Sequence, residues 1–173
     1  MQPDQATFLL NDVFLPNLKN EHRLTMKVIE AIPLDKGDYR PDEISKTALE
    51  LAWHVVVMEQ RFLNGVAAGG FDFSPIPRPE TVKNSADMAN LYDQTFESNF
   101  QKVAALSPEQ ASKVLDFRGI FQLPAVAFLR ASMSHTIHHR GQLSTYLRAL
   151  GGKVPAIYGE SYDSAEAKKA ARA

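Results

Sequence analysis

The chain has 173 residues, of which 45% are hydrophobic and 23% are charged, and its formal net charge is −1. A chain of this length suits one globular domain, residues 1–173, with a core of its own. The balanced charge argues against a nucleic-acid partner, and the absence of cysteine excludes disulfides, thiolate metal ligands and a cysteine nucleophile.

Two features of the sequence bear on its location. The apolar runs are too short to cross a bilayer, so we expect no membrane partner. The first residues, Met1-Gln2-Pro3-Asp4, show no basic region followed by an apolar core. We therefore expect no signal peptide and a cytoplasmic location.

The spacing of apolar residues predicts a first helix over residues 5–32. Pro16 lies inside this range and should kink or split the helix near Leu15, because proline cannot complete the helical hydrogen-bonding pattern. His22 has polar neighbours on both sides in the sequence. We therefore expect its side chain to be solvated and not to bind a metal.

A second helix is predicted over residues 45–65, and its centre is apolar nearly all the way round, as in helices packed on most sides. His54 lies in that centre. A buried histidine needs partners for its ring nitrogens, so His54 either forms a hydrogen bond to a neighbouring helix or binds a metal ion. Glu50 lies four residues earlier on roughly the same face. We expect it to be a surface residue or one that orients a ligand, with metal ligation as the alternative.

The segment 67–83 is rich in glycine and proline and should be irregular, and a loop of this length either covers a site or caps the core. A third helix is predicted over residues 85–105, followed by a short helix and by an extended stretch within residues 114–123. The tail after Gly151 should be irregular at first, with residues 164–173 forming a frayed helix.

The fourth helix should start with Pro124 in its first turn and end at a glycine pair. It contains three of the five histidines of the chain. His135 and His139 are four residues apart, which places both imidazoles on one face, where they can share a metal ion. His138 is rotated by about 100° from His139 toward a polar flank, so we expect it not to be a ligand. The alternative is that the histidine pair packs in the core without a metal.

Three segments of the chain form a recognisable set of motifs. Tyr39-Arg40-Pro41 leads into Leu51-Ala52-Trp53-His54, the sequence HTIHHRGQL occupies residues 135–143, and GGKVPAIYG occupies residues 151–159. With these motifs, which place landmarks along most of the chain, the sequence resembles the DinB/YfiT-like family of metalloenzymes. The middle segment is the most specific of the three.

The resemblance implies an all-α fold, namely a four-helix bundle of up-down-down-up type with long connecting loops, often assembled as a homodimer. It also implies one divalent metal ion, commonly zinc or nickel, held by ligands that map onto His54, His135 and His139. Characterised relatives include S-transferases that use low-molecular-weight thiols such as bacillithiol, and a mycothiol-dependent isomerase. Because thiol-binding residues are not part of the shared motif, the resemblance assigns no catalytic residue.

Three neutral histidines leave at least one position open on the ion, which is typical of catalytic sites. An open position can hold water and lower its pKa, or take a thiol and deprotonate it. Since the chain has no cysteine, a thiolate must come from a small-molecule co-substrate, and the leading hypothesis is a metal-dependent thiol S-transferase. A metal-assisted hydrolase and a non-catalytic metal- or ligand-binding bundle are the alternatives. Proton competition should weaken metal binding below about pH 6.

Overall fold

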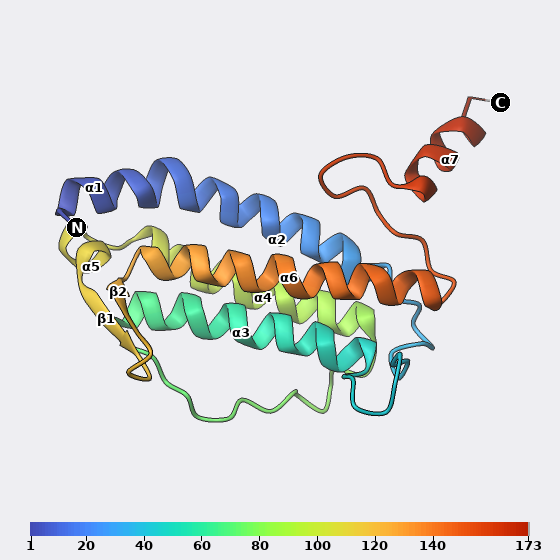
Figure 1. Ribbon diagram of the computed structural model, residues 1–173, viewed down its shortest axis with the longest axis horizontal. Coiled ribbons are helices and arrows are strands. Elements are labelled where there is room, and N and C mark those ends of the chain that lie inside the picture. The colour runs from blue at the N-terminus through green and yellow to red at the C-terminus, as the bar shows by residue number, and fades with distance from the viewer. Residues whose placement is uncertain (173) are drawn as a thin grey trace.

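Four long helices are the main elements of the computed structural model, which describes residues 1–172 (Figure 1). They are α2 (Leu15–Glu30), α3 (Ala48–Ala68), α4 (Ser85–Ala104) and α6 (Ala127–Ala149). The shorter elements are α1 (Pro3–Phe8), the π-helix η1 (Leu9–Phe14), α5 (Pro108–Ser112), the strands β1 (Val114–Phe117) and β2 (Phe121–Pro124), and α7 (Tyr162–Ala170). The mostly helical fold predicted from the sequence is confirmed.

Each long helix packs against two others. α3 packs against α4 and α6, and α2 packs against the same two helices. Their buried faces form two hydrophobic clusters, one around Phe62 and Phe128 and the other around Ile29 and Leu143. Figure 1 shows that the irregular loop after α3 runs along the helices before α4 begins. The helices thus bury a core of their own around the centre of the molecule.

The winding of the first helical segment changes just before Pro16. α1 passes into η1, and α2 begins at Leu15 with a proline in its first turn. Pro16 has no N–H to donate, so regular α-helical bonding is interrupted in the residues that precede it, and a π-helical stretch takes up the difference. The break predicted near Leu15 is confirmed, although helical winding continues through it.

Local hydrogen bonds explain where α3 starts and ends. Thr47 Oγ1 accepts a hydrogen bond from the N–H of Glu50 at 3.2 Å, and the Glu50 carboxylate accepts one from the N–H of Thr47 at 2.8 Å. This reciprocal capping box fixes the first turn. Gly69 ends the helix with a φ of 73°, in the left-handed region that favours glycine. Both ends of α3, Ala48–Ala68, therefore lie three residues later than in the predicted range 45–65.

The strands β1 and β2 form an antiparallel hairpin in which Leu115 lies opposite Leu123. The predicted extended stretch is therefore confirmed. The placement of Pro124 in the first turn of the last long helix is wrong, because this residue ends β2 and α6 begins at Ala127. The pairing continues past the proline, since Ala125 N–H donates to the Lys113 carbonyl at 2.8 Å.

The C-terminal segment ends in α7, which starts two residues before the predicted position 164. Ser161 caps it by accepting a hydrogen bond from the N–H of Ser164 at 3.0 Å. The predicted tail helix extends to residue 173, which lies outside the described residues. Within residues 1–172, no helix is both long and apolar enough to cross a membrane.

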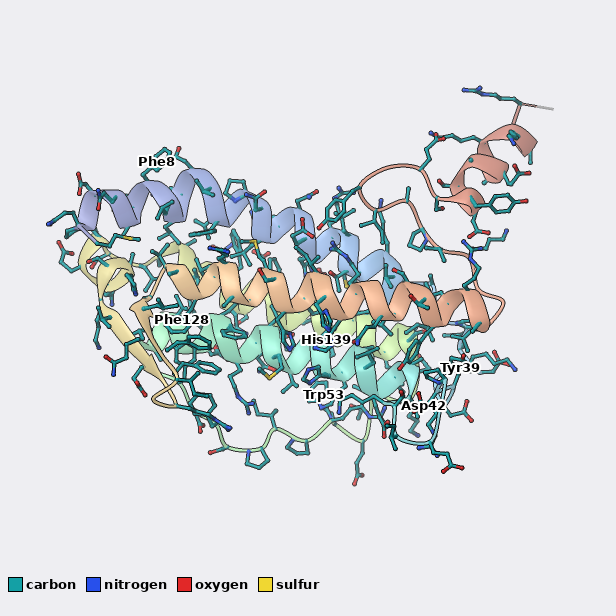
Figure 2. All side chains as sticks on the ribbon, in the orientation of Figure 1. Phe8, Tyr39, Asp42, Trp53, Phe128 and His139 are labelled. Carbon is teal, nitrogen blue, oxygen red and sulfur yellow. The ribbon has the colours of Figure 1, made fainter. Side chains whose placement is uncertain are left out.

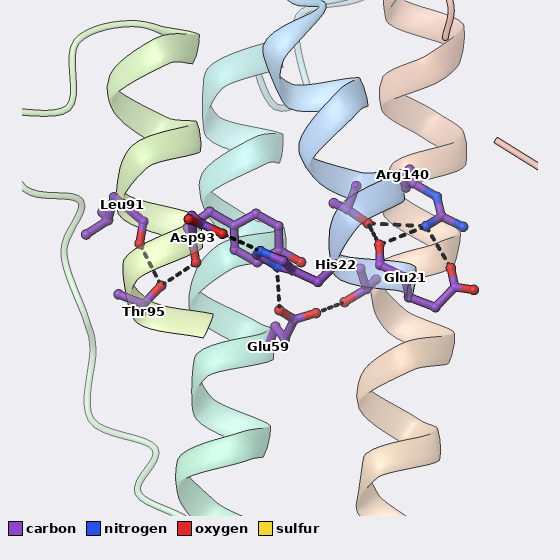
Figure 3. A network of polar contacts seen from close by, with 10 residues as sticks. Glu21, His22, Glu59, Leu91, Asp93, Thr95 and Arg140 are labelled. Atoms are coloured by element: carbon purple, nitrogen blue, oxygen red, sulfur yellow. Dashed lines mark hydrogen bonds and ion pairs between the residues drawn. The ribbon is translucent and has the colours of Figure 1, made fainter. Parts of the chain in front are cut away.

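His22 lies in the core, so the expectation of a solvated side chain is wrong. The residue is 6% exposed, its ring stacks on Phe96 with a centroid distance of 3.8 Å, and its Nε2 lies 3.1 Å from Asp93 Oδ1 (Figure 3). Glu59 is also buried, with Oε1 3.9 Å from His22 Nδ1, and its Oε2 accepts a hydrogen bond from Thr136 at 3.3 Å. A chain of polar groups thus crosses the interior between α2, α3, α4 and α6.

Candidate metal centre

Three histidines from two neighbouring helices converge in the interior. α3 contributes His54, and α6 contributes His135 and His139. His54 Nε2 lies 3.1 Å from His135 Nε2 and 3.2 Å from His139 Nε2, and one ligand atom from each residue lies within 4.8 Å of the other two. In Figure 2, His139 lies midway along α6. The structure therefore brings together the three histidines that the sequence singled out.

The spacing of these nitrogens suits a divalent metal ion. Zinc–nitrogen bonds are about 2.0–2.1 Å long, which places two nitrogens of a tetrahedral site about 3.3 Å apart. The two measured Nε2 separations, 3.1 Å and 3.2 Å, are close to this value. The three imidazoles could therefore hold one ion. Their chemistry does not select the metal, because imidazole suits zinc, nickel, copper and iron alike.

A glutamine one turn along α6 orients one of the three rings. Gln142 Oε1 lies 2.6 Å from His139 Nδ1. An amide oxygen can only accept, so Nδ1 carries the proton and Nε2 keeps its lone pair for the ion. Metal-ligating histidines commonly donate their second ring N–H to such an acceptor. The Nδ1 atom of His135, by contrast, is buried and has no hydrogen-bond partner among the described residues.

All three imidazoles are half-buried, and each has a lowered pKa. Burial, together with the positive charges of His139 and Lys46, lowers the pKa of His54 to about 4. Burial and the charges of the neighbouring histidines lower the pKa of His135 to about 4. Burial also lowers the pKa of His139. The rings are therefore neutral at physiological pH, which is the form that binds a metal.

Nearly the whole chain matches one known family. The model of the DinB family matches residues 5–171. The chain belongs to the DinB family. It is 29% identical over 133 residues to the uncharacterised protein YjoA of Bacillus subtilis, which covers 75% of this chain and 84% of YjoA. It is also 26% identical over 157 residues to YrdA of the same organism, covering 86% of this chain and 87% of YrdA.

Solved structures of DinB-like proteins have the same fold. The crystal structure of B. subtilis YjoA matches with a TM-score of 0.72 at 24% identity, and the match covers 86% of this chain and 99% of that one. A DinB-like protein from Bacillus cereus matches with a TM-score of 0.70 at 22% identity, covering 86% and 97% of the two chains. The fold of this DinB chain is therefore DinB-like.

Two neighbours of the cluster in this DinB chain do not take part in it. His138 is exposed, and its ring centroid lies 4.8 Å from that of His139, on the flank expected from the sequence. It is not among the residues whose ligand atoms converge. Glu50 uses its carboxylate to cap the first turn of α3 through Thr47 N–H. That hydrogen bond gives Glu50 a structural role and leaves metal ligation by it unsupported.

The DinB chain also contains a buried arginine that sequence reasoning missed. Arg140 is 1% exposed, and its guanidinium lies 2.7 Å from Glu21 Oε2 and donates to Thr25 Oγ1 at 3.3 Å (Figure 3). The hydroxyl of Tyr158 donates to Glu21 Oε2 at 2.7 Å. These contacts tie α6 to α2 and to the C-terminal segment, next to the ligand candidate His139. The only available signal was its position inside the HTIHHRGQL motif.

Proposed function

We propose that this DinB-family protein is a metal-dependent enzyme that activates a low-molecular-weight thiol for transfer of its sulfur to an electrophile. The observation that carries the proposal is the convergence of three half-buried, neutral imidazoles with no carboxylate or fourth histidine in the cluster within residues 1–172. Such a set leaves an exchangeable position on the ion, as catalytic sites do and closed structural sites do not. Zinc and nickel are the proposed ions.

Each residue of the site has a proposed role in the reaction. His54, His135 and His139 hold the ion, and Gln142 fixes the ring of His139. A divalent ion, when bound, supplies a Lewis acid that lowers the pKa of a thiol in its open position. In the transfer, the thiol proton passes to solvent and the sulfur forms a bond to the electrophilic carbon, while the leaving group departs with the electron pair of the broken bond. Because the chain has no cysteine, the sulfur comes from the co-substrate.

The arrangement of the carboxylates favours a thiol over water as the nucleophile. Metal-dependent hydrolases commonly use a glutamate beside the ion as general base. Here the carboxylate of Glu50 is bonded to Thr47 N–H, and that of Glu59 accepts a hydrogen bond from Thr136. A thiol needs no such base, because coordination to the ion is enough to deprotonate it. Hydrolysis and metal binding without turnover are therefore the outcomes that an experiment has to separate from thiol transfer.

The proposal includes the assembly expected of the family. Each chain is proposed to be a four-helix bundle of up-down-down-up type, and the long loop that returns along the helices between α3 and α4 supports this order (Figure 1). Two chains are proposed to form a homodimer that acts on a small-molecule substrate. Light scattering coupled to size-exclusion chromatography tests the dimer.

A thiol-consumption assay tests the proposed reaction. Purified protein loaded with zinc or nickel is mixed with a thiol and an activated aryl halide, alongside the metal-free protein and the His54→Ala variant. Thiol consumption that occurs only when the aryl halide is present, and that requires both the metal and His54, supports S-transfer. Halide loss without thiol points to hydrolysis. Metal binding with neither reaction across a panel of thiols and electrophiles contradicts the enzyme and leaves a binding module.

A further inference from the structure

A groove of about 470 Å³ adjoins the metal centre at the end of the molecule where α3 begins. His54 forms one wall, Trp53 and Val57 give the groove an apolar side, and Lys46 and Arg40 lie along its rim. In Figure 2, Trp53 lies below His139 near the middle of the bundle, and Asp42 lies further toward the end where α3 begins. A molecule bound at the histidines through one atom would have room for the rest of its body in this groove.

The loop that carries the two cations is held in place by its own hydrogen bonds. Asp42 Oδ1 accepts from the N–H groups of Ile44 and Ser45 at 3.0 Å and 2.8 Å, and Arg40 donates to the carbonyl of Glu43 at 3.2 Å. The hydroxyl of Tyr146 on α6 donates to the carbonyl of Lys46 at 3.3 Å, which joins the end of the loop to the helix that carries His135 and His139. The cations are thus presented by an ordered segment.

Lys46 and His54 line the same groove. The lysine ion pairs found within residues 1–172 involve Lys36, Lys168 and Lys169, so Lys46 is in none of them, although its charge also acts on the nearby Glu50 carboxylate. An anion bound between the ion and Lys46 would experience attraction from both.

Two carboxylates and a helix N-terminus also lie near the groove, and they have to be accounted for. Glu50 and Glu43 line it, but the Glu50 carboxylate is held by Thr47 N–H at 2.8 Å. The free N–H groups of the first turn of α3 are taken as well, because Ala48 donates to the Tyr39 carbonyl and Leu49 to the Gly37 carbonyl. Recognition of an anion here therefore depends on the side chains of Lys46 and Arg40.

We propose that this groove is the recognition site for a carboxylate on the thiol substrate, with Lys46 and Arg40 as its specificity-determining residues and Trp53 as the apolar wall beneath the carbon chain. The proposal rests on the proposed function, since it places the sulfur at the histidine cluster. The substrate class is a small thiol that carries a carboxylate. A neutral or cationic thiol of the same size would lack the partner for the two cations.

Calorimetric titration of zinc-loaded protein tests the groove separately from turnover. The probes are mercaptopropionate, mercaptoethanol and cysteamine, which are anionic, neutral and cationic thiols of similar size. We expect mercaptopropionate to bind about tenfold more tightly than mercaptoethanol, with the preference weakening as salt is added. In the Arg40→Ala/Lys46→Ala variant the preference should nearly vanish while the zinc content stays unchanged. The Arg23→Ala/Lys27→Ala variant removes two exposed charges from α2 and should keep the preference.

The possible results separate the two proposals. If none of the three thiols binds the zinc-loaded protein, the proposed thiol function fails and the groove assignment fails with it. If the thiols bind but mercaptopropionate has no advantage, or if its advantage survives in the Arg40→Ala/Lys46→Ala variant, the groove assignment alone is overturned. Tighter binding of cysteamine that depends on Glu43 or Glu50 would also overturn it, because it would reverse the charge that the groove selects.

Discussion

Gln142 Oε1 lies 2.6 Å from His139 Nδ1, so one turn of α6 contains both a ligand candidate and the acceptor that orients it. The neighbouring Nδ1 of His135 has no such partner among residues 1–172. Of the two α6 imidazoles, only that of His139 thus has its Nδ1 atom held by a side-chain hydrogen bond that the structure describes. This asymmetry makes Gln142 the clearest place to test whether the cluster is built for a metal.

Replacing Gln142 with Ala should weaken metal binding by about 10- to 100-fold, because the His139 ring loses the acceptor that fixes its tautomer. The Gln142→Glu variant keeps an acceptor in place and should bind metal nearly as well as the original protein. Competition with a chromogenic chelator measures both affinities. As a control, Gln101→Ala removes a glutamine that is hydrogen-bonded to Glu97 on the surface of α4 and should change nothing. Equal affinity in the Gln142→Ala variant would remove the orienting role.

Each of the variants His54→Ala, His135→Ala and His139→Ala should lose most of its metal, since two imidazoles hold a divalent ion far less well than three. His138→Ala is the matched control, because it removes a histidine next to His139 that is exposed and outside the cluster. Elemental analysis of the purified variants measures occupancy. Full occupancy in His54→Ala, or loss of metal only in His138→Ala, would show that the ligand set is assigned wrongly.

The pairing of His135 with His139 could be predicted from the sequence because helical periodicity determines which residues share a face, whereas His54, on another helix, joined the predicted ligand set through the resemblance to the DinB/YfiT-like family. The same rule should have predicted the burial of His22. Leu18, Thr25 and Ile29 lie at steps of four, three and seven residues from it, and all three are buried. The polar residues beside His22 in the sequence point to other faces of α2. Adjacent residues were therefore the wrong guide.

The role of Arg140 could not be predicted in this way. One of its partners, Glu21, is 119 residues away in the sequence, and periodicity within a helix does not say which other helix lies opposite.

The start of α6 was missed for a similar reason. Pro124 is compatible with a first helical turn and with a strand end, and the pairing of β1 with β2 decides between them.

The pH at which metal binding weakens should be lower than the value of about 6 expected from the sequence. Burial lowers the pKa of His54 and of His135 to about 4, so protons begin to displace the ion near that pH and not near the ordinary histidine pKa of 6.5. We expect metal affinity to change little between about pH 8 and about pH 6 and to fall steeply toward about pH 4. Titration of metal release across this range measures it. A midpoint near pH 6.5 would contradict the lowered pKa values.

The same lowered pKa values should make the stability of the metal-free protein depend on pH. Between pH 6.5 and about 4 the unfolded chain binds protons on these histidines and the folded chain does not, so the free energy of unfolding should decrease as the pH falls through this window. Below about 4 this contribution should level off. Urea unfolding at several pH values measures the slope, which should be smaller in the His54→Asn/His135→Asn variant.

Metal removal should leave the helices in place. The two hydrophobic clusters, around Phe62 and Ile29, are formed by side chains that do not contact the ion site through hydrogen bonds or coordination. Far-ultraviolet circular dichroism of protein treated with a chelator should therefore match that of the metal-loaded form, while the melting temperature should rise with added metal. A metal-free protein without helical signal would mean that the ion is structural and would weaken the proposed chemistry.

The buried pair of Arg140 and Glu21 gives the last prediction. The two side chains are 2% and 11% exposed, and their atoms lie 2.7 Å apart. Arg140→Ala would leave the Glu21 carboxylate buried without its cation, so the free energy of unfolding should fall by about 3–5 kcal/mol. The Glu21→Leu/Arg140→Leu variant removes both charges and should lose less than Arg140→Ala alone, because no unpaired charge remains. Arg148→Ala breaks a pair with Asp163 in which the arginine is 53% exposed, and it should cost less than about 1 kcal/mol. Denaturant unfolding of the metal-free forms measures all three, and a cost for Arg140→Ala no larger than that for Arg148→Ala would show that the buried pair does not hold α6 against α2.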